Sequence, residues 1–305
     1  MDTKEILNIL PQNIKTALDD YINLKDLEEI RIRADKPLVL QAGNREIIHK
    51  YIPRAEDLKS IIQRMSSYSI YAFEEEIKQG YITIKGGHRV GICGRCVVEG
   101  NQVKTIRNIA SVNIRICREI LFCSDSIMKF ILSNNQVINT IIISPPKCGK
   151  TTLLRDIVRN ISDGIDKIGL IGRKVCVIDE RSELGACYSG SPQLNIGIRT
   201  DILDGCPKSE GIIMAIRSMS PDVIVCDEIG TYKDMDSVLT ALNSGVNLIT
   251  TIHGYDIEDL YNRPVFKEII ENNVFKRAIV LSNKKGVGTV EYVYDFDNKS
   301  VIWRG

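Results

Sequence analysis

The residues with the clearest capacity for chemistry lie between an apolar segment at 137–143 and a segment with helical character. They are Ser144, Pro145, Pro146, Lys147, Cys148, Gly149, Lys150, Thr151 and Thr152. Their spacing fits a phosphate-binding loop, except that Ser144 stands where the first glycine is expected. In such a loop, backbone N–H groups hold phosphate oxygens, the ammonium of Lys150 binds the β- and γ-phosphates, and the hydroxyl of Thr151 binds Mg²⁺. An accidental Gly-Lys-Thr is the alternative, but the expected strand, loop and helix favour a site for ATP and Mg²⁺.

A second apolar segment, at 222–226, ends in two carboxylates, Asp227 and Glu228. Beside a phosphate loop, such a pair suits nucleotide hydrolysis. Asp227 would hold the Mg²⁺ shell, and Glu228 would orient and polarise the attacking water. Strand ends often carry an acid that merely caps the next helix, so the pair is informative only together with the phosphate loop.

Two further expected strands also end in polar residues. One is followed by Asp179, Glu180, Arg181 and Glu183, and the other by His253. The carboxyl ends of parallel strands converge on one crevice, so these side chains are expected around the nucleotide. There His253 would hydrogen-bond the γ-phosphate; the alternative is a loop histidine bonded to backbone.

Phosphoryl transfer also needs positive charge near the γ-phosphate, which a neighbouring subunit often supplies. The candidates are Arg181 and Arg199 in this half of the chain and Arg107, Arg115 and Arg118 just before it. Each is equally compatible with an ordinary solvated arginine.

The elements that must position these residues fall into two predicted domains. Residues 1–120 indicate a smaller α+β domain, with expected strands at 27–33, 37–48 (a hairpin), 81–85, 88–98, 102–106 and 112–117 and helices at 54–66 and 68–79. Residues 121–305 indicate an α/β domain, with a capped helix at 124–132, strands at 137–143, 174–178, 222–226, 247–252 and 278–281, and a final hairpin of 289–296 and 301–303. The alternation of strands and helices in the second domain predicts a mainly parallel sheet with helices on both faces.

Composition excludes several classes of protein. Among the 305 residues, Lys and Arg total 40 and Asp and Glu total 39, so the formal net charge at pH 7 is +1. That balance argues against binding to nucleic acid through bulk charge, although residues 104–118 are locally basic. No apolar run approaches the roughly 20 residues that a membrane-spanning helix needs, and the first residues do not form a signal peptide. We therefore expect a cytoplasmic chain whose contact with any membrane is peripheral.

The nine cysteines are scattered and odd in number, which is typical of reduced thiols inside the cell. Cys93 and Cys96 have the two-residue spacer of zinc ligands, but no second pair shares it. Zinc is therefore the disfavoured alternative to packed thiols.

Long motifs across the chain resemble the stage III sporulation protein AA family. They lie at residues 87–95, 178–184, 197–211, 217–222 and 226–230. That family is itself similar to the hexameric secretion ATPases of type II and type IV systems and pili. The resemblance implies a RecA-like ATPase domain after an α+β domain, and a cytoplasmic homo-hexamer at a membrane complex. This complex would join mother cell and forespore, with the ring on the mother-cell side and membrane proteins of the channel as partners.

Carried over residue by residue, Lys150 and Thr151 match the family's phosphate loop, and Glu228 matches its Walker B glutamate. Glu183 matches the acid of the Asp box and His253 the His box. Ser144 and Lys147 replace two loop glycines, and Asp227-Glu228 stands where secretion ATPases usually have Gly-Glu. The resemblance implies an ATP-driven motor. A nucleotide-binding ring scaffold with little hydrolysis and a RecA-like nucleic-acid motor are the rival interpretations, and the balanced charge opposes the latter.

Overall fold

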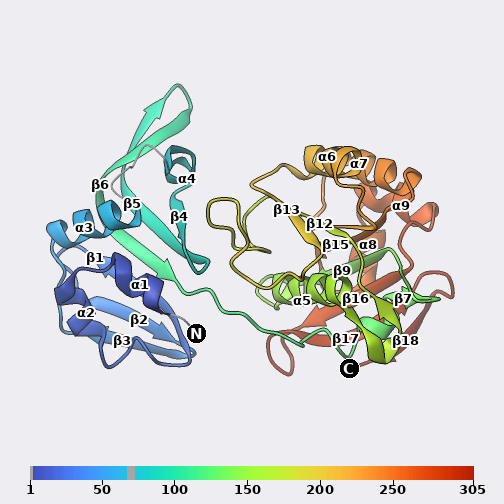
Figure 1. Ribbon diagram of the computed structural model, residues 1–305, viewed down its shortest axis with the longest axis horizontal. Helices are drawn as coiled ribbons and strands as arrows, with labels where there is room; N and C mark the ends of the chain where they lie inside the picture. Colours follow the sequence, from blue (N-terminus) through green and yellow to red (C-terminus); the bar gives the residue numbers. More distant parts are fainter. Residues whose placement is uncertain (1–2, 67–72) are drawn as a thin grey trace. The chain divides into compact units, whose positions relative to one another are not determined.

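The computed structural model describes residues 3–66 and 73–305. They belong to two compact units, Met1–Arg118 and Glu119–Gly305 (Figure 1). The first unit is packed around one apolar cluster and the second around two, one on each face of its sheet.

The first unit contains a six-stranded antiparallel sheet in the order β3-β2-β1-β6-β5-β4. Its strands are β1 (Leu27–Arg33), β2 (Leu38–Ala42), β3 (Arg45–His49), β4 (Tyr81–Ile84), β5 (His88–Glu99) and β6 (Gln102–Arg115). Its helices are α1 (Lys4–Ile9), α2 (Gln12–Leu18), α3 (Ala55–Met65) and α4 (Glu74–Lys78). In β1 buried apolar residues alternate with exposed charged ones: Ile30 and Ile32 are buried, whereas Arg31 and Arg33 are exposed.

Sequence periodicity misjudged two features of this unit. The two strands expected at 102–106 and 112–117 are one continuous strand, β6. Its pairing with β5 is irregular around Asn108, and this irregularity interrupts the alternation of residues without ending the strand. Helices α1 and α2 were not expected. Part of the helix expected at 68–79 lies outside the described residues, and α4 occupies its later part.

The second unit is built on an eight-stranded sheet in the order β13-β12-β14-β15-β9-β16-β17-β18. The first six strands are parallel and the last two are antiparallel, which confirms the predicted parallel-rich α/β fold. The strands are β9 (Thr140–Ser144), β12 (Val175–Asp179), β13 (Thr200–Asp204), β14 (Val223–Cys226), β15 (Asn247–His253), β16 (Arg277–Ser282), β17 (Thr289–Asp295) and β18 (Ser300–Arg304). Two small hairpins join β7 (Leu132–Ser133) to β8 (Gln136–Val137) and β10 (Gly164–Ile165) to β11 (Leu170–Ile171).

Helices cover both faces of this sheet, as expected (Figure 1). They are α5 (Lys150–Asp163), α6 (Lys208–Ser218), α7 (Tyr232–Asn243), α8 (Ile257–Tyr261) and α9 (Lys267–Glu271), with short 3₁₀ turns at Met128–Phe130, Asp166–Ile168 and Pro264–Phe266. Alternate residues of each strand separate to the two faces: Val177 packs in the core that contains α5, whereas Ile178 packs in the core that contains α6 and α7. The central strands are buried on both faces, which is why they are continuously apolar.

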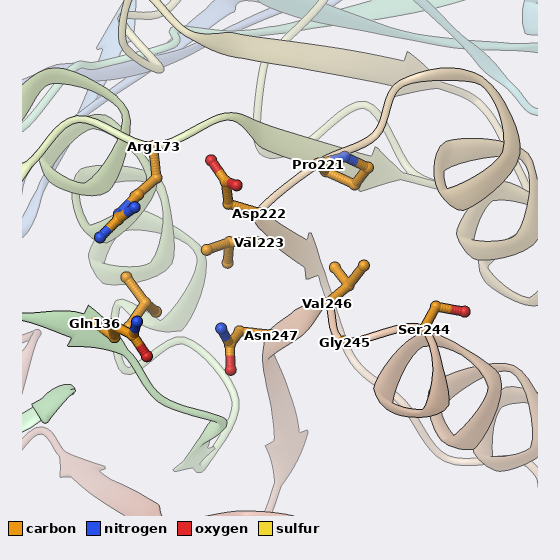
Figure 2. Close-up of a pocket in the computed structure, with 10 residues that line it drawn as sticks. Gln136, Arg173, Pro221, Asp222, Val223, Ser244, Gly245, Val246 and Asn247 are labelled. Carbon is orange, nitrogen blue, oxygen red and sulfur yellow. The ribbon is translucent and has the colours of Figure 1, made fainter.

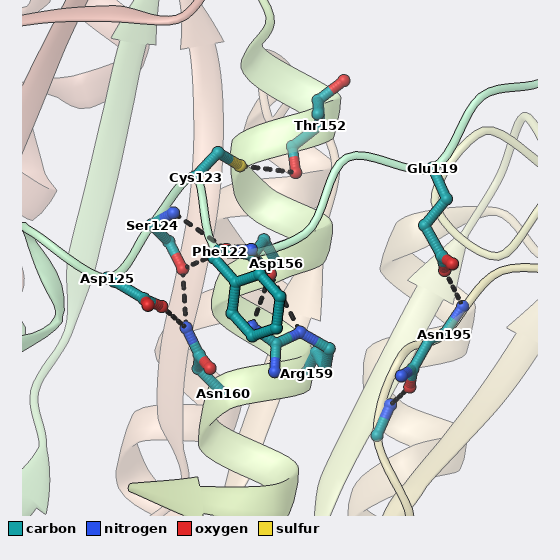
Figure 3. Close-up of polar contacts among 11 residues, drawn as sticks. Glu119, Phe122, Cys123, Ser124, Asp125, Thr152, Asp156, Arg159, Asn160 and Asn195 are labelled. Carbon is teal, nitrogen blue, oxygen red and sulfur yellow. Dashed lines mark hydrogen bonds and ion pairs between the residues drawn. The ribbon is translucent and has the colours of Figure 1, made fainter. Parts of the chain in front are cut away.

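The expected capped helix at 124–132 is wrong, because only the 3₁₀ turn at Met128–Phe130 forms there. Ser124 has the residue type of a helix cap, but its hydroxyl donates to Asp156 Oδ2 on α5 at 2.8 Å instead (Figure 3). Strand β13 was not expected either. None of its residues is fully buried, so its sequence shows no clear alternation of apolar and polar residues.

The segment that opens the second unit is anchored on α5 by the buried carboxylate of Asp156 (Figure 3). This carboxylate accepts hydrogen bonds from the backbone N–H groups of Phe122 (3.1 Å) and Ser124 (2.8 Å) and from two nitrogens of Arg159 (2.9 and 2.7 Å). Burial disfavours its charged form, but the hydrogen bonds from Ser124 and Arg159 outweigh burial and hold the pKa of Asp156 below its usual value.

Asp156→Ala is expected to lower the free energy of unfolding of the second unit by about 3 kcal/mol, because it leaves Arg159 buried without its partner. The depressed pKa means that this stabilisation is present above about pH 4 and is lost as the pH falls through the folded-state pKa of Asp156. Urea denaturation from pH 7 downward measures both effects. The exposed Asp166 provides the matched control, and equal stability of the two alanine variants at pH 7 would contradict the anchoring role.

Candidate nucleotide-binding site

The loop between β9 and α5 has the backbone that phosphate binding needs. Gly149, which immediately precedes α5, adopts a φ of 82°, and Lys147 adopts a φ of 60°. A residue with a side chain would be strained at Gly149, since a Cβ there would lie only 3.1 Å from both Gly288 N and Val287 Cγ1. The glycine therefore permits both the turn and the close approach of a second loop, while α5 directs its first N–H groups into the space beyond.

A cavity of about 320 Å³ opens at this point. It is lined by Pro145, Pro146, Lys147, Gly149, Lys150, Thr151, Thr152, Arg181, Glu183, Asp227, Glu228 and His253. Residues from the loop and from the ends of three different strands thus meet at one edge of the sheet, because β12, β14 and β15 all run parallel to β9.

At the centre of the cavity, a lysine, two acids and a histidine form one polar network. Lys150 Nζ lies 3.7 Å from Glu228 Oε2 and 4.0 Å from Asp227 Oδ1. His253 Nε2 lies 3.0 Å from the same Glu228 oxygen. The Lys150 side chain is only 10% exposed, so its charge acts through a poorly screened environment.

Sequence reasoning missed the residue that orients Asp227. Thr251 Oγ1 donates a hydrogen bond of 3.0 Å to Asp227 Oδ1 from the neighbouring strand, β15. Thr251 is fully buried, and a polar side chain inside a buried strand was the available signal.

The acids at the end of β12 and just after it have separate roles. Asp179 does not line the cavity; its buried carboxylate accepts the backbone N–H groups of Glu183 (2.8 Å), Leu184 (2.9 Å) and Gly185 (2.9 Å). Burial raises the pKa of Asp179 to about 6, against the opposing effect of these donors. Asp179 thus folds the loop that presents Glu183 to the cavity.

A buried arginine that the sequence did not reveal as important holds the same loop from the other side. Arg155, on α5, donates to the backbone oxygens of Glu183 (2.7 Å) and Leu184 (2.6 Å). Glu180 instead pairs with Lys208 at the start of α6. Of the three acids expected near the nucleotide after β12, only Glu183 lines the cavity, together with Arg181.

Three further residues that were expected at the site do not line the cavity. Ser144 is buried and its hydroxyl donates to Pro145 O at 2.9 Å, and the Cys148 side chain is buried beneath the loop. Arg199 donates to Ser162 O at 2.9 Å, at the end of α5 opposite Lys150. Twelve residues of helix separate those ends, or about 18 Å, so Arg199 does not serve the cavity of its own chain.

The donor atoms present suit Mg²⁺ that is bound together with a nucleotide. Thr151 and Asp227 offer hydroxyl and carboxylate oxygens at the cavity. Within residues 3–66 and 73–305, no group of three or more His, Cys, Asp or Glu side chains is arranged to hold a metal ion. Mg²⁺ usually takes one or two protein ligands and completes its shell with phosphate oxygens and water.

A second cavity, of about 270 Å³, lies at the amino ends of β14 and β15, away from the phosphate loop (Figure 2). Arg173, Asp222 and Asn247 border it. Asp222 Oδ2 accepts the backbone N–H of Lys174 at 2.9 Å, so its carboxylate serves to fix the start of β12. The chemistry predicted from the sequence is therefore gathered at the opposite edge of the sheet.

Solved structures share this fold. The Legionella pneumophila ATPase DotB is 16% identical, covers 89% of this chain and 76% of its own, and superposes with a TM-score of 0.60. The pilus retraction motor PilT, solved with bound ADP, is also 16% identical, with coverages of 88% and 76% and a TM-score of 0.56. The chain thus shares the RecA-like α/β fold of these two proteins.

The family model described as "Sporulation stage III, protein AA" matches residues 1–301. Stage III sporulation protein AA of Bacillus subtilis is 45% identical over 295 residues, which is 96% of this chain and 95% of that protein. The chain belongs to the sporulation stage III protein AA family. A protein of Porphyra purpurea named ycf45 is 26% identical over 275 residues, but these cover only 44% of its length. No helix in the described part of the chain is long and apolar enough to cross a membrane.

Proposed function

We propose that this protein binds ATP in the cavity beside the phosphate loop and hydrolyses it with Mg²⁺. The observation that carries the proposal is the convergence of Lys150, Asp227, Glu228 and His253 at the mouth of that loop. A phosphate-binding cation, a carboxylate for the metal shell and a second carboxylate for water are the parts that phosphoryl transfer to water requires.

Each residue has a distinct part in this mechanism. Lys150 leaves its carboxylate partners to bind the β- and γ-phosphates, and Thr151 and Asp227 hold Mg²⁺, which when bound neutralises charge on the phosphate oxygens. Glu228 orients the attacking water and polarises its O–H bond. His253, 3.0 Å from Glu228, holds that carboxylate in place and reaches toward the γ-phosphate.

Completion of the site requires a further cation near the γ-phosphate. Arg181 lines the cavity within the chain. Arg199 lies far from it, so its contribution would be to the site of a neighbouring copy. We propose a homo-hexamer in which each active site is completed across a subunit boundary.

In the cell, we propose that this ring energises assembly of the channel between mother cell and forespore, or transport through it. Family membership and the secretion-ATPase fold support this role. The ring would lie in the cytoplasm on the mother-cell side, peripheral to the membrane, with channel membrane proteins as partners. The net charge of +1 argues against binding of nucleic acid through bulk charge.

A nucleotide-binding scaffold with little hydrolysis is the second candidate, and two observations favour it. Lys147 adopts a φ of 60°, a conformation that costs a non-glycine residue about 1–2 kcal/mol. Lys150 is also ion-paired to both carboxylates and must leave them to bind phosphate. The first cost is one that glycine would avoid, and the second feature holds the proposed catalytic groups Lys150 and Glu228 to each other, so both act against turnover.

ATP turnover and particle mass, measured together, test the two candidates. We expect turnover that a Mg²⁺ chelator abolishes, and a mass that rises toward six copies with protein concentration when ATP and Mg²⁺ are present. Assembly without turnover would favour the scaffold, and absence of both turnover and assembly would contradict the proposed function.

A further inference from the structure

The phosphate cavity offers little surface for a nucleoside. Apart from two prolines, a glycine and the imidazole ring of His253, the residues that line it carry charged or hydroxyl-bearing side chains. Binding sites for organic ligands are lined mainly by apolar and aromatic groups, and about 320 Å³ lies at the small end of their size range. The cavity thus suits the phosphates and metal, and the base of a bound nucleoside triphosphate must rest outside it.

Strand order indicates the side on which the base lies. The groups assigned to the metal, the attacking water and the γ-phosphate, which are Asp227, Glu228 and His253, follow or end β14 and β15, on one side of β9. The other neighbour of β9 is β16, which is parallel to it and ends at the same edge of the sheet. Since the phosphate chain separates the base from the γ-phosphate, the base is directed away from the carboxylates and toward the end of β16.

The loop that follows β16 is docked on the phosphate loop. Gly288 N donates a hydrogen bond of 3.1 Å to Cys148 O. Val287 Cγ1 stands 3.1 Å from the position of a Cβ on Gly149, so the two loops are in van der Waals contact. Val287 is nevertheless 73% exposed. An apolar side chain therefore faces solvent beside the N–H groups that would hold phosphate.

This loop is also preformed. Gly286 N donates to Asn283 O at 3.1 Å, and Thr289 Oγ1 donates to Gly286 O at 2.7 Å. Gly288 has a φ of 87°, which a residue with a side chain would adopt only with strain. Ligand binding to a surface held in this way requires little additional ordering.

We propose that residues 283–288 form the nucleoside wall of the site, with Val287 packed against the base and Gly288 bringing the backbone close to it. The contact is apolar, so it recognises the flat face of a base and not its hydrogen-bonding edge. The inference rests on the proposed binding of ATP but not on hydrolysis, so it applies equally to the motor and to the scaffold.

Val287→Ser tests the wall, because it removes apolar contact at an exposed position without disturbing a core. Calorimetry with Mg²⁺ compares two probes: ATP, and inorganic tripolyphosphate, which has no nucleoside. We expect the dissociation constant for ATP to rise about fivefold, the effect of losing roughly one buried methyl-sized contact. The constant for tripolyphosphate should not change.

Ile171→Ser is the matched control, because Ile171 is also 73% exposed and lies on β11, outside the site. Unchanged ATP affinity in Val287→Ser, or equal weakening of ATP and tripolyphosphate, would overturn the nucleoside wall while leaving nucleotide binding intact. If the wild-type protein binds neither probe, the proposed function fails, and the nucleoside wall fails with it.

Discussion

Glu228→Gln is expected to reduce ATP turnover at least 100-fold while ATP still binds. Glutamine keeps the size of the side chain, but its amide is a far weaker base than a carboxylate. A positioned general base typically contributes a factor of about 10² to 10⁴ to the rate. Turnover measured at saturating ATP, together with ATP affinity from calorimetry, separates the loss of chemistry from a loss of binding.

Glu210→Gln is the control for this substitution. Glu210 lies on α6, is largely exposed and pairs only loosely with Lys233, so neutralising it should leave turnover unchanged. Turnover of Glu228→Gln within threefold of wild type would remove Glu228 from the mechanism. Loss of turnover in both variants would point to a general effect of charge on the protein.

Lys150→Met is expected to weaken ATP binding by at least 30-fold, and turnover should disappear with it. Methionine retains most of the apolar stem but removes the ammonium, and truncating one partner of a buried charged contact costs about 2–5 kcal/mol. The substitution also leaves Asp227 and Glu228 without the cation that lies between them and the loop. Calorimetry with ATP and Mg²⁺ measures the affinity directly.

Lys233→Met provides the matched control, since Lys233 is 71% exposed and lies on α7 outside the cavity. Thermal unfolding of both variants shows whether the fold is retained. A folded Lys150→Met variant with ATP affinity within threefold of wild type would show that the phosphate loop is not the nucleotide site.

Features encoded in contiguous residues could be predicted without the structure. The expected strand at 27–33 coincides with β1, because an apolar residue at every second position records which face of a strand is buried. The phosphate loop is similarly local, since Gly149, Lys150 and Thr151 act through the turn that they themselves form. Ser124 misled the prediction because its local preference for a helix cap lost to a hydrogen bond with Asp156, 32 residues away.

The sequence by itself therefore determined the parallel-rich sheet, the loop and the acids and histidine at the strand ends. Only the tertiary structure decided that Glu183 lines the cavity whereas Asp179 and Glu180 do not, that Arg199 lies at the far end of α5, and that Thr251 orients Asp227. It also brought the loop after β16 against Gly149, more than 130 residues earlier. The physical reason is that strand order and side-chain partners depend on contacts between distant segments, and no local spacing records which strand becomes the neighbour of which.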